Sequence, residues 1–382
     1  MKQGREYKKL GDFITEYSIK NKSNETIPVY SVTNSQGFCK EYFNKEVASK
    51  DKSTYKIVPY GCFAYNPSRI NVGSIDWQNK EERVIVSPLY NVFSVSENLN
   101  QDYLLYFIKS NGTMGLINAQ ATGTVRLNLK LSMLKEFQIP IPSLHQQLSI
   151  VSELDKIKEL ISLKKEQLND YDKLTQSLFY ELFGDPIENK KGWEKKKLGD
   201  VCSEIKYGTS KPACDNGKYK YLRMCNLSYD GYLDLTDVKR IDVSDEEIEK
   251  CIGRYGDILF NRTNSVELIG KTCMFDQQEP MVIAGYIIRV RLTNELMPQV
   301  LARMFNLASI KKLLRSMAKG AVNQANINSK ELASIQIPIP PLALQQHFVK
   351  RIELIEQQKA EIQSTIADLE TLLASRMQYW FD

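Results

Sequence analysis

Polar side chains that could bind a nucleic acid gather in both halves of this 382-residue chain. In the second half they are Tyr207, Thr209, Ser210, Lys211, Arg223, Asn226, Arg262, Asn264, Lys319, Asn323 and Gln324. In the first half they are Tyr65, Asn66, Ser68, Arg69, Thr122, Thr124, Arg126 and Asn128. Arg suits guanine edges, Asn and Gln suit adenine, and Ser, Thr and Lys suit phosphates. For any one of these residues a turn-stabilising or solvated role is the commoner alternative, so only the pattern in both halves favours DNA.

No set of residues has the spacing of a catalytic site. Residues 269–272 (Ile-Gly-Lys-Thr) end like a phosphate-binding loop, but Ser265 stands where the leading glycine is required. Residues 65–68 (Tyr-Asn-Pro-Ser) are similar to the Asn-Pro-Pro-aromatic loop of adenine methyltransferases, but the second proline and the aromatic residue are missing. His145 and His347 fall near the starts of two expected helices and are expected at the surface. We therefore expect no catalysis from this chain alone.

Composition leaves room for two or three domains and gives only a weak nucleic-acid signal. The net charge is +5, positive in the globular stretches and mildly acidic in the expected helices. Seven cysteines without a Cys-x-x-Cys pair, and only two histidines, argue against a zinc site and favour a reduced, cytoplasmic setting. Residues 1–22 are polar and charged, so no secretory signal is expected, and no apolar run approaches the length of a membrane span.

One stretch occurs twice, 198 residues apart, and the chain is organised around it. Residues 138–142 and 336–340 both read Gln-Ile-Pro-Ile-Pro, and each is followed by a long helical pattern. Apolar residues at alternating steps of three and four are typical of a coiled-coil seam. Lys164, Thr175, Lys359 and Arg376 interrupt it. We expect the helices to pair antiparallel, although each could merely cover a local core. The predicted pairing residues are Ile150, Leu154, Ile157, Ile161, Leu168, Leu178 and Leu182 in the first helix, and Ile352, Ile355, Ile362, Ile366, Leu369, Leu373 and Trp380 in the second.

The repeat extends into the globular stretches. Lys-Leu-Gly-Asp occurs at 9–12 and again at 197–200, and Tyr60-Gly61 matches Tyr255-Gly256. Strands are expected at 27–34, 60–66, 89–95, 220–226, 255–261 and 286–292, and short helices at 102–110 and 298–316. The predicted fold class is α+β, with two similar α/β domains joined by two long helices and a pseudo-twofold internal repeat. The predicted boundaries are 1–143 and 184–340 for the globular domains, and 144–183 and 341–382 for the helices.

These features together resemble the specificity subunit of type I restriction–modification enzymes. The resemblance rests on both Ile-Pro-Ile-Pro helices, the Lys-Leu-Gly-Asp repeat, residues 208–212 (Gly-Thr-Ser-Lys-Pro) and residues 256–259 (Gly-Asp-Ile-Leu). It covers the whole chain, and the first half departs from it in two ways. Cys62 replaces the Asp of Gly-Asp, and the Gly-Thr-Ser-Lys-Pro loop is missing.

The resemblance implies a non-catalytic subunit whose two target-recognition domains read a bipartite sequence in double-stranded DNA. It implies that the helix pair is a spacer and a docking surface for two methyltransferase subunits. S-adenosylmethionine is then bound only by those partners, and a motor-nuclease subunit joins them for cleavage. The alternatives are a coiled-coil scaffold that binds proteins instead of DNA, and a self-sufficient methyltransferase, which the missing cofactor loop disfavours.

Overall fold

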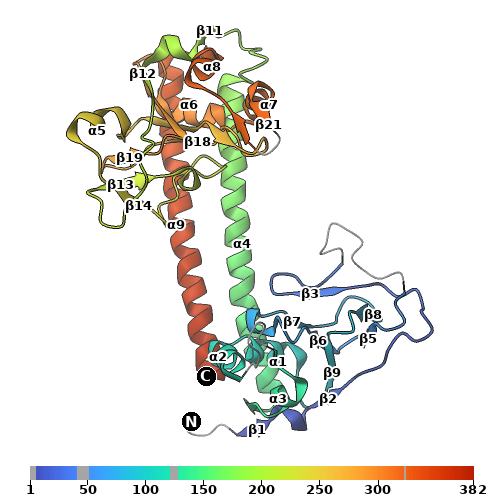
Figure 1. Ribbon diagram of the computed structural model, residues 1–382. Helices are drawn as coiled ribbons and strands as arrows, with labels where there is room; N and C mark the ends of the chain where they lie inside the picture. The colour runs from blue at the N-terminus through green and yellow to red at the C-terminus, as the bar shows by residue number, and fades with distance from the viewer. Residues whose placement is uncertain (1–5, 41–50, 121–127, 322–323) are drawn as a thin grey trace. The chain divides into compact units, whose positions relative to one another are not determined.

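The chain forms two compact units that each combine a globular stretch with parts of both long helices. The computed structural model describes residues 6–40, 51–120, 128–321 and 324–382, with backbone only at 319–321 and 324. Unit 1 comprises Met1–Lys165 and Gln363–Asp382, and unit 2 comprises Glu166–Ile362 (Figure 1). The predicted boundaries set the helices apart from the globular domains, whereas the compact units divide each helix between them.

The two long helices are α4 (Leu144–Phe183) and α9 (Leu342–Phe381), each of 40 residues. Neither contains an internal proline or glycine, so no kink or break is imposed on it. A capping box starts α4: the backbone N–H of Ser143 donates to Oε1 of Gln146 over 3.2 Å, and the backbone N–H of Gln146 donates to Oγ of Ser143 over 3.4 Å. Pro341 directly precedes α9, where its missing N–H costs no helical hydrogen bond.

Inside each unit α4 and α9 pack antiparallel. In unit 1, Ile150 from the start of α4 shares a hydrophobic cluster with Leu373 and Trp380 from the end of α9. In unit 2, Leu182 from the end of α4 shares a cluster with Ile352 from the start of α9. Every predicted pairing residue is buried or half-buried. The antiparallel coiled coil expected from the heptad pattern is therefore present.

Two of the charged residues that interrupt the seam, Lys359 and Arg376, form ion pairs across it. Nζ of the buried Lys359 donates over 2.6 Å to Oδ1 of Asp172 and over 2.6 Å to the hydroxyl of Tyr232. In unit 1, Arg376 binds both carboxylate oxygens of Glu153. A buried charge is tolerated when an opposite charge and hydrogen bonds satisfy it. These pairs therefore allow polar side chains at positions where the heptad pattern calls for apolar ones.

Unit 1 is built on an antiparallel sheet with the strand order β2-β9-β6-β7, accompanied by the pairs β3-β4, β5-β8 and β1-β10. Tyr103 and Phe107 on α1 pack against Phe381 at the end of α9, and this contact joins the sheet layer to the helix pair. The elements of unit 1 besides the long helices are β1 (Tyr7–Lys9), η1 (Leu10–Asp12), β2 (Ile14–Glu16), β3 (Ser31–Thr33), β4 (Gly37–Cys39), β5 (Lys56–Pro59), β6 (Phe63–Tyr65), η2 (Ile70–Val72), β7 (Ile75–Trp77), β8 (Arg83–Val86), β9 (Asn91–Val95), α1 (Gln101–Ile108), α2 (Asn111–Gln120), α3 (Leu131–Lys135) and β10 (Gln138–Pro140).

Unit 2 repeats this plan with the sheet β12-β20-β16-β18, and it also contains the sheets β14-β13-β19-β15 and β17-β22-β21. Its strand pair β11-β23 corresponds to β1-β10. The elements of unit 2 are β11 (Glu194–Lys197), η3 (Leu198–Val201), β12 (Cys202–Tyr207), β13 (Tyr219–Leu222), η4 (Met224–Asn226), β14 (Lys239–Ile241), α5 (Asp245–Cys251), β15 (Ile252–Gly253), β16 (Ile258–Asn261), β17 (Thr263–Asn264), β18 (Thr272–Met274), β19 (Met281–Ile283), β20 (Ile287–Leu292), α6 (Pro298–Phe305), α7 (Ala308–Met317), β21 (Lys319–Ala321), β22 (Gln324–Asn326), α8 (Ser329–Ala333) and β23 (Gln336–Ile339).

Two predicted elements of unit 2 differ from the structure. The helix expected over 298–316 is two helices, because Asn306 ends α6 and its amide donates to the carbonyl of Thr272 over 2.8 Å. The strand expected over 220–226 ends at Leu222, because Asn226 closes a turn by accepting the N–H of Arg223 over 2.9 Å. In both cases an asparagine side chain binds backbone groups, and so competes with regular structure.

The repeated sequence motifs make equivalent contacts in the two units. A Cβ added at Gly11 would lie 3.0 Å from the carbonyl oxygen of Lys135 on α3, and one at Gly199 would lie 3.2 Å from Cβ of Ala333 on α8. In both units a short helix thus approaches the glycine of Lys-Leu-Gly-Asp so closely that a larger residue would not fit there without a shift. This approach holds the start of each globular stretch against the short helix that precedes its Ile-Pro-Ile-Pro strand.

The glutamine that follows each Ile-Pro-Ile-Pro stretch is fully buried and bonded to backbone on both sides. In unit 1, Gln147 accepts the N–H of Asn100 over 2.9 Å and donates to the carbonyls of Asn98 and Pro142, each over 3.0 Å. In unit 2, Gln345 makes the same three bonds, to Met297, Glu295 and Pro340. Each glutamine therefore fastens a long helix to the segment that starts α1 or α6. We call this set of bonds the glutamine lock.

Candidate nucleic-acid interface

The polar loops of unit 2 meet around the turn that follows β19. β19 and β13 are parallel neighbours, and the N–H of Ala284 donates to the carbonyl of Leu222 over 2.9 Å. The N–H of Gly285 donates to the carbonyl of Thr209 over 2.7 Å. The carbonyl of Tyr286 accepts the N–H of Arg262 over 3.0 Å. The ends of β12, β13, β16 and β19 therefore bring the loops 208–212, 223–226 and 262–264 to one edge, the unit 2 edge.

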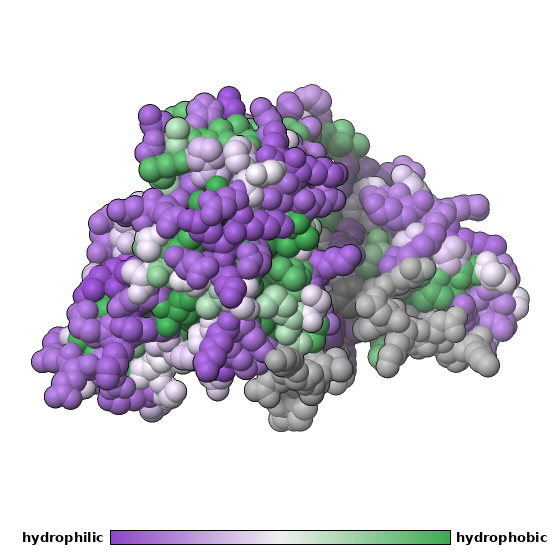
Figure 2. Space-filling view, turned by 90° about the horizontal axis from the view of Figure 1, so that it is seen from above, coloured by the Kyte–Doolittle hydropathy of each residue, from purple (hydrophilic) through white to green (hydrophobic). Residues whose placement is uncertain are grey.

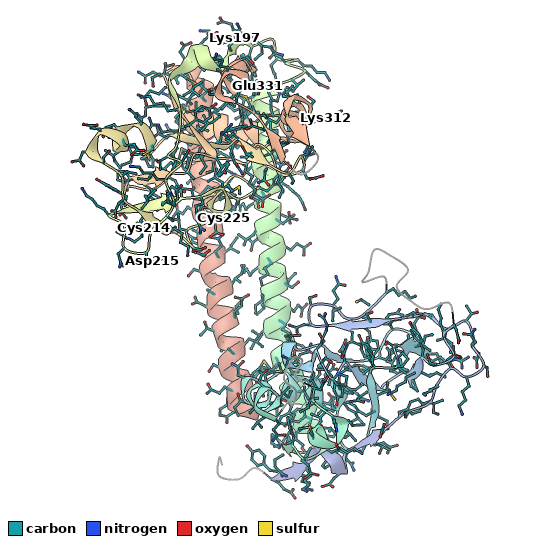
Figure 3. All side chains as sticks on the ribbon, viewed as in Figure 1. Lys197, Cys214, Asp215, Cys225, Lys312 and Glu331 are labelled. Carbon is teal, nitrogen blue, oxygen red and sulfur yellow. The ribbon has the colours of Figure 1, made fainter. Side chains whose placement is uncertain are left out.

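Figure 3 locates two of these loops inside unit 2. Cys214 and Asp215 mark the continuation of the 208–212 loop, and Cys225 marks the turn after β13. The three labelled residues lie at one end of unit 2, and Lys197 on β11 lies at the other. The predicted DNA-binding loops are thus at the end of unit 2 that is remote from its β11-β23 strand pair.

Arg262 lies over the ring of Tyr207 at the unit 2 edge. Its guanidinium carbon is 5.0 Å from the ring centroid, and the hydroxyl of Tyr207 accepts the N–H of Ser329 over 2.8 Å. Nε of Arg262 is buried and has no hydrogen-bond partner among the described residues. Stacking on an aromatic ring fixes the plane of a guanidinium. Arg262 is thereby held in one orientation with unused donors.

The loop of residues 208–212 divides into a buried and an exposed part. Thr209 is buried, accepts the N–H of Lys211 over 3.2 Å and donates to Oε1 of Glu247 over 3.3 Å. Lys211 lies 2.5 Å from Oε2 of Glu247, and its hydrogen bond holds the pKa of that carboxyl below its usual value. Thr209 therefore shapes the loop in this structure, and its part in DNA binding stays a prediction. Ser210 and Lys211 are exposed.

Arg223 is positioned by Asn226 and paired with Asp237. The amide of the buried Asn226 donates to the carbonyls of Asp234 and Asp237 over 2.8 and 3.1 Å. Arg223 donates to Oδ2 of Asp237 over 2.7 Å, and this bond holds the pKa of the Asp237 carboxyl below its usual value. The side chain of Asn226 is thus bonded inside the turn, and its part in DNA binding stays a prediction. Arg223 remains partly exposed.

A small sheet made of β17, β22 and β21 stands beside Arg262. Asn264 lies in β17, opposite Ala325 in β22. Lys319 and Gln324 lie in β21 and β22, which form a hairpin, and Asn323 lies outside the described residues. Three of the predicted residues of this region, Asn264, Lys319 and Gln324, therefore fall on one hairpin and the strand paired with it, adjacent to the unit 2 edge.

In unit 1 the predicted residues fall into three groups. Asn66, Ser68 and the exposed Arg69 form a turn in which Oδ1 of Asn66 accepts the N–H of Ser68 over 3.0 Å. Tyr65 is fully buried, and its hydroxyl donates to the carbonyl of Leu129 over 3.2 Å, so it supports the turn. Its part in DNA binding stays a prediction. Thr122, Thr124 and Arg126 lie outside the described residues.

The two units hold their last loop in the same way. Oγ of Ser68 donates to Oδ1 of Asn128 over 2.6 Å, and Oγ1 of Thr263 donates to Oδ1 of Asn326 over 3.1 Å. In unit 1 the N–H of Leu129 donates to the carbonyl of Pro67 over 3.2 Å. In unit 2 the N–H of Ile327 donates to the carbonyl of Arg262 over 2.9 Å. Asn128 and Asn326 are 198 residues apart, the offset of the helical repeat. The candidate interface is therefore built twice on one plan.

The structure adds residues that the sequence analysis did not select. Tyr286 is exposed at the unit 2 edge, at the first position of the predicted strand and one residue before β20 begins, and was not selected as a binding residue. Asp237 and Glu247 pair with the two predicted cations, Arg223 and Lys211. They come from parts of the chain that only the fold brings close, so residue type and spacing carried no signal for them.

The described residues carry no group of His, Cys, Asp and Glu arranged to hold a metal ion. His145 and His347 are both exposed in the first turns of α4 and α9. All seven cysteines are free. In the view of Figure 2 the surface is mostly hydrophilic, with small apolar areas between the polar ones. Of the helices that the structure describes, none has an apolar stretch of the length that a membrane requires.

Comparison with known proteins agrees with this geometry. The family model of the type I restriction modification DNA specificity domain matches residues 3–170 and 190–370. The chain belongs to this family. The two matched stretches correspond to the two repeats, each with its globular part and most of its long helix.

Among curated relatives, the EcoKI specificity subunit of Escherichia coli strain K12 is 24% identical over 267 residues, which cover 66% of this chain and 57% of that protein. The MjaIX specificity subunit of Methanocaldococcus jannaschii is 30% identical over 145 residues, covering 33% of each chain. The matched parts thus span between a third and three fifths of these relatives.

Two solved structures share the fold. A chain from work on complex assembly and conformational transition of the type I R-M system has a TM-score of 0.64 and 19% identity, covering 99% of this chain and 98% of its own. The S subunit of a type I restriction-modification system from M. genitalium has a TM-score of 0.50 and 16% identity, covering 100% and 98%. At these identities the likeness concerns the fold.

Proposed function

We propose that this chain is the DNA-recognition subunit of a type I restriction–modification complex and that each unit reads one half of a bipartite target. The observation that carries the proposal is the repeated construction of the candidate interface. Both units hold an Asn-containing turn against the following loop by the same Ser/Thr–Asn hydrogen bond, while the residues around it differ. A shared frame with different side chains suits two readers of different sequences.

The geometry suggests how unit 2 would bind duplex DNA. Arg262 stacks on Tyr207, so its guanidinium is pre-oriented for a bidentate contact with a guanine edge. Ser210 and Lys211 are exposed and suit phosphate oxygens. Asp237 and Glu247 neutralise Arg223 and Lys211 in the unbound chain, so a phosphate or base must replace a carboxylate there. Base contacts would set the sequence, and phosphate contacts would set the position.

The chain would supply no chemistry of its own. We propose that two methyltransferase subunits bind S-adenosylmethionine and methylate adenine, that this chain binds no cofactor, and that a motor-nuclease subunit joins for cleavage. Free thiols in a DNA-binding chain suit the cytoplasm. The support for non-catalysis is that the described polar residues at the candidate edges are mainly Arg, Lys, Asn, Ser, Thr and Tyr, and no nucleophile–base pair is found among them.

Exposed leucines that recur at the repeat offset support two copies of one partner. Leu144 and Leu342 are 45% and 46% exposed, and Leu174 and Leu372 are 51% and 45% exposed. Each unit contains one leucine of each pair. Readers of different half-targets need not share surface residues, whereas two copies of one partner require the same surface twice. We therefore propose that these leucines contact the methyltransferase subunits.

The partner proposal is tested by Leu144→Lys and Leu342→Lys, singly and together. Each single variant should retain one methyltransferase subunit per chain, and the double variant should retain none, as measured by light scattering of the purified complex. Leu354→Lys is the matched control, because Leu354 is exposed on α9 but its repeat counterpart is Lys156. Full assembly of the double variant would contradict the proposed contact.

The DNA proposal is tested by salt titration of binding and by sequencing of methylated DNA. The purified complex should bind its target with an affinity that falls steeply as salt rises, because phosphate contacts release counterions. A host that expresses this chain with its methyltransferase should show one methylated bipartite motif. Binding without salt dependence, together with no methylated motif, would instead support a protein-binding scaffold.

A further inference from the structure

One large apolar side chain is exposed at the same position of the sheet edge in both units. Tyr65 in β6 lies opposite Asn91 in β9, and its equivalent Phe260 in β16 lies opposite Ile288 in β20. Leu89 is two residues before Asn91, and Tyr286 is two residues before Ile288. The two residues therefore occupy equivalent positions, each next to the strand end that leads into a predicted DNA-binding turn.

Both side chains are left largely in solvent. Leu89 is 73% exposed and Tyr286 is 53% exposed. Neither belongs to a hydrophobic cluster of the described residues, and the hydroxyl of Tyr286 has no hydrogen-bond partner among them. One exposed apolar residue is ordinary on a protein surface. The same exposure at an equivalent position in two sequences that otherwise differ points to a shared use.

In unit 2, hydrogen-bonding groups lie beside Tyr286. The carbonyl of Tyr286 accepts the N–H of Arg262, and a Cβ added at Gly285 would lie 3.1 Å from Oγ of Ser210. In unit 1 the residue after Leu89 is Tyr90, where burial raises the pKa of the phenol and the Arg69 guanidinium opposes that rise. Tyr286 is thus bonded to an arginine that the sequence analysis selected for DNA binding, and Leu89 is the chain neighbour of a tyrosine whose pKa another selected arginine lowers.

Resting on the proposed DNA-reading function, we propose that Leu89 and Tyr286 are specificity-determining residues that contact the 5-methyl group of a thymine, one in each half-target. Arg, Asn, Ser and Lys can read the donors and acceptors of base edges and bind phosphates. The thymine methyl is the one apolar group that unmodified base pairs present in the major groove. A side chain that offers only apolar surface at the tip, as Leu89 does, has no other base-edge partner there.

The experiment measures methylation of duplexes in which deoxyuridine replaces thymidine at one position at a time, using the complex of this chain with its methyltransferase. The methylated motif of the wild-type complex first defines the two half-targets. For the wild type, loss of one methyl group in each half should lower kcat/KM roughly three- to ten-fold, because it exposes apolar surface equivalent to about one methylene. Substitution at the other thymines should have little effect.

The variants assign each contact to a residue. Leu89→Ala should abolish the deoxyuridine effect in one half-target only, and Tyr286→Ala should abolish it in the other half only. The matched controls are Tyr60→Ala and Tyr255→Ala, which remove exposed tyrosines at the opposite ends of β6 and β16. Both controls should keep the wild-type deoxyuridine effect in both halves.

Three outcomes would overturn the inference. The first is a sequence-specific wild-type complex that is indifferent to deoxyuridine at every position. The second is a deoxyuridine effect that persists unchanged in Leu89→Ala and Tyr286→Ala. The third is a wild-type complex without any sequence preference, which overturns the proposed function and this inference with it. The first two leave the proposed function intact, so the failures are distinguishable.

Discussion

Arg262 and Arg223 show two ways of holding an arginine ready at a surface. Arg262 is oriented by the ring of Tyr207, and Arg223 by the carboxylate of Asp237 and the turn that Asn226 closes. The first arrangement leaves the positive charge uncompensated, whereas the second compensates it until a ligand displaces the carboxylate. The two arginines should therefore differ in how strongly salt and neighbouring acids control them.

Replacing either arginine by alanine should weaken target binding by about 1–3 kcal/mol and relax the preference at one base pair, because a bidentate base contact is lost. The measurements are the dissociation constant for the target duplex and the methylated motif of each variant. Asp237→Asn serves as the companion variant. It frees Arg223 and should strengthen binding to non-target DNA. Unchanged affinity and an unchanged motif in both alanine variants would remove these arginines from the interface.

Lys311 on α7 makes the stability of unit 2 depend on pH. Its Nζ donates to the carbonyl of Gly270 over 2.9 Å, and burial lowers the pKa of Lys311 to about 8. In the unfolded chain the pKa returns towards 10.5, so the unfolded chain binds more protons between about pH 8 and 10.5. The free energy of unfolding should therefore rise with pH in that window.

The test compares wild type with Lys311→Met, which keeps the side-chain length without the charge. Relative to this variant, the free energy of unfolding of the wild type should rise by up to about 3 kcal/mol between pH 8 and 10.5, since one pKa unit corresponds to about 1.36 kcal/mol. Thermal unfolding of both proteins across that range gives the difference. A difference that does not change with pH would contradict the assignment.

At the scale of elements, the glutamine lock explains why Gln follows both Ile-Pro-Ile-Pro stretches. Gln345→Ala should leave the N–H of Met297 and the carbonyls of Glu295 and Pro340 buried without a partner. Each such group costs about 1–3 kcal/mol, so a total loss of at least about 3 kcal/mol is expected. Denaturant unfolding gives the value. The adjacent exposed residue provides the control, because Gln346→Ala should change stability by less than about 0.5 kcal/mol.

The elements that the sequence predicted best are those with long periodic patterns or repeated motifs. Both 40-residue helices, their antiparallel pairing and the positions of β6, β9, β16 and β20 agree with the expectations. Heptad spacing and internal repetition carry that information, because burial of the same face recurs many times. The break at Asn306 and the turn at Asn226 escaped prediction, because single side-chain bonds to distant backbone decide them.

The candidate site was less predictable than the fold for the same reason. Residue type selected Arg262, Arg223, Ser210 and Lys211, which the structure brings to the unit 2 edge. It also selected Tyr65, Thr209 and Asn226, which are buried, because a polar or aromatic side chain at a strand end can face either way. Only the register of the strands and the hydrogen bonds of each turn separate these two groups.

At the scale of the whole molecule, both long helices run without a break from one unit into the other. We predict that this helix pair sets the distance between the two half-targets of the proposed function. Inserting one heptad into each helix, at matched positions 198 residues apart, keeps the seam and adds roughly 10 Å of helix. The gap between half-targets should lengthen by up to roughly three base pairs, at about 3.4 Å per base pair, with both half-sequences unchanged.

The readout is the methylated motif of the lengthened protein. The matched control is a heptad inserted into one helix only, which shifts the seam on one side and should reduce activity instead of producing a new gap. An active doubly lengthened protein that kept the original gap would show that the helices do not determine the spacing.

The strand pairs β1-β10 and β11-β23 place the entry and the exit of each globular stretch side by side, about 5 Å apart. The parts of each stretch that do not pack on α4 or α9 can change without moving the helices or the exposed leucines. In a gene, this makes each reader a cassette bounded by two short shared sequences, Lys-Leu-Gly-Asp and Ile-Pro-Ile-Pro. Under the proposed function, exchange of one such cassette would give the complex a new DNA target, and the gene of its methyltransferase could remain unchanged.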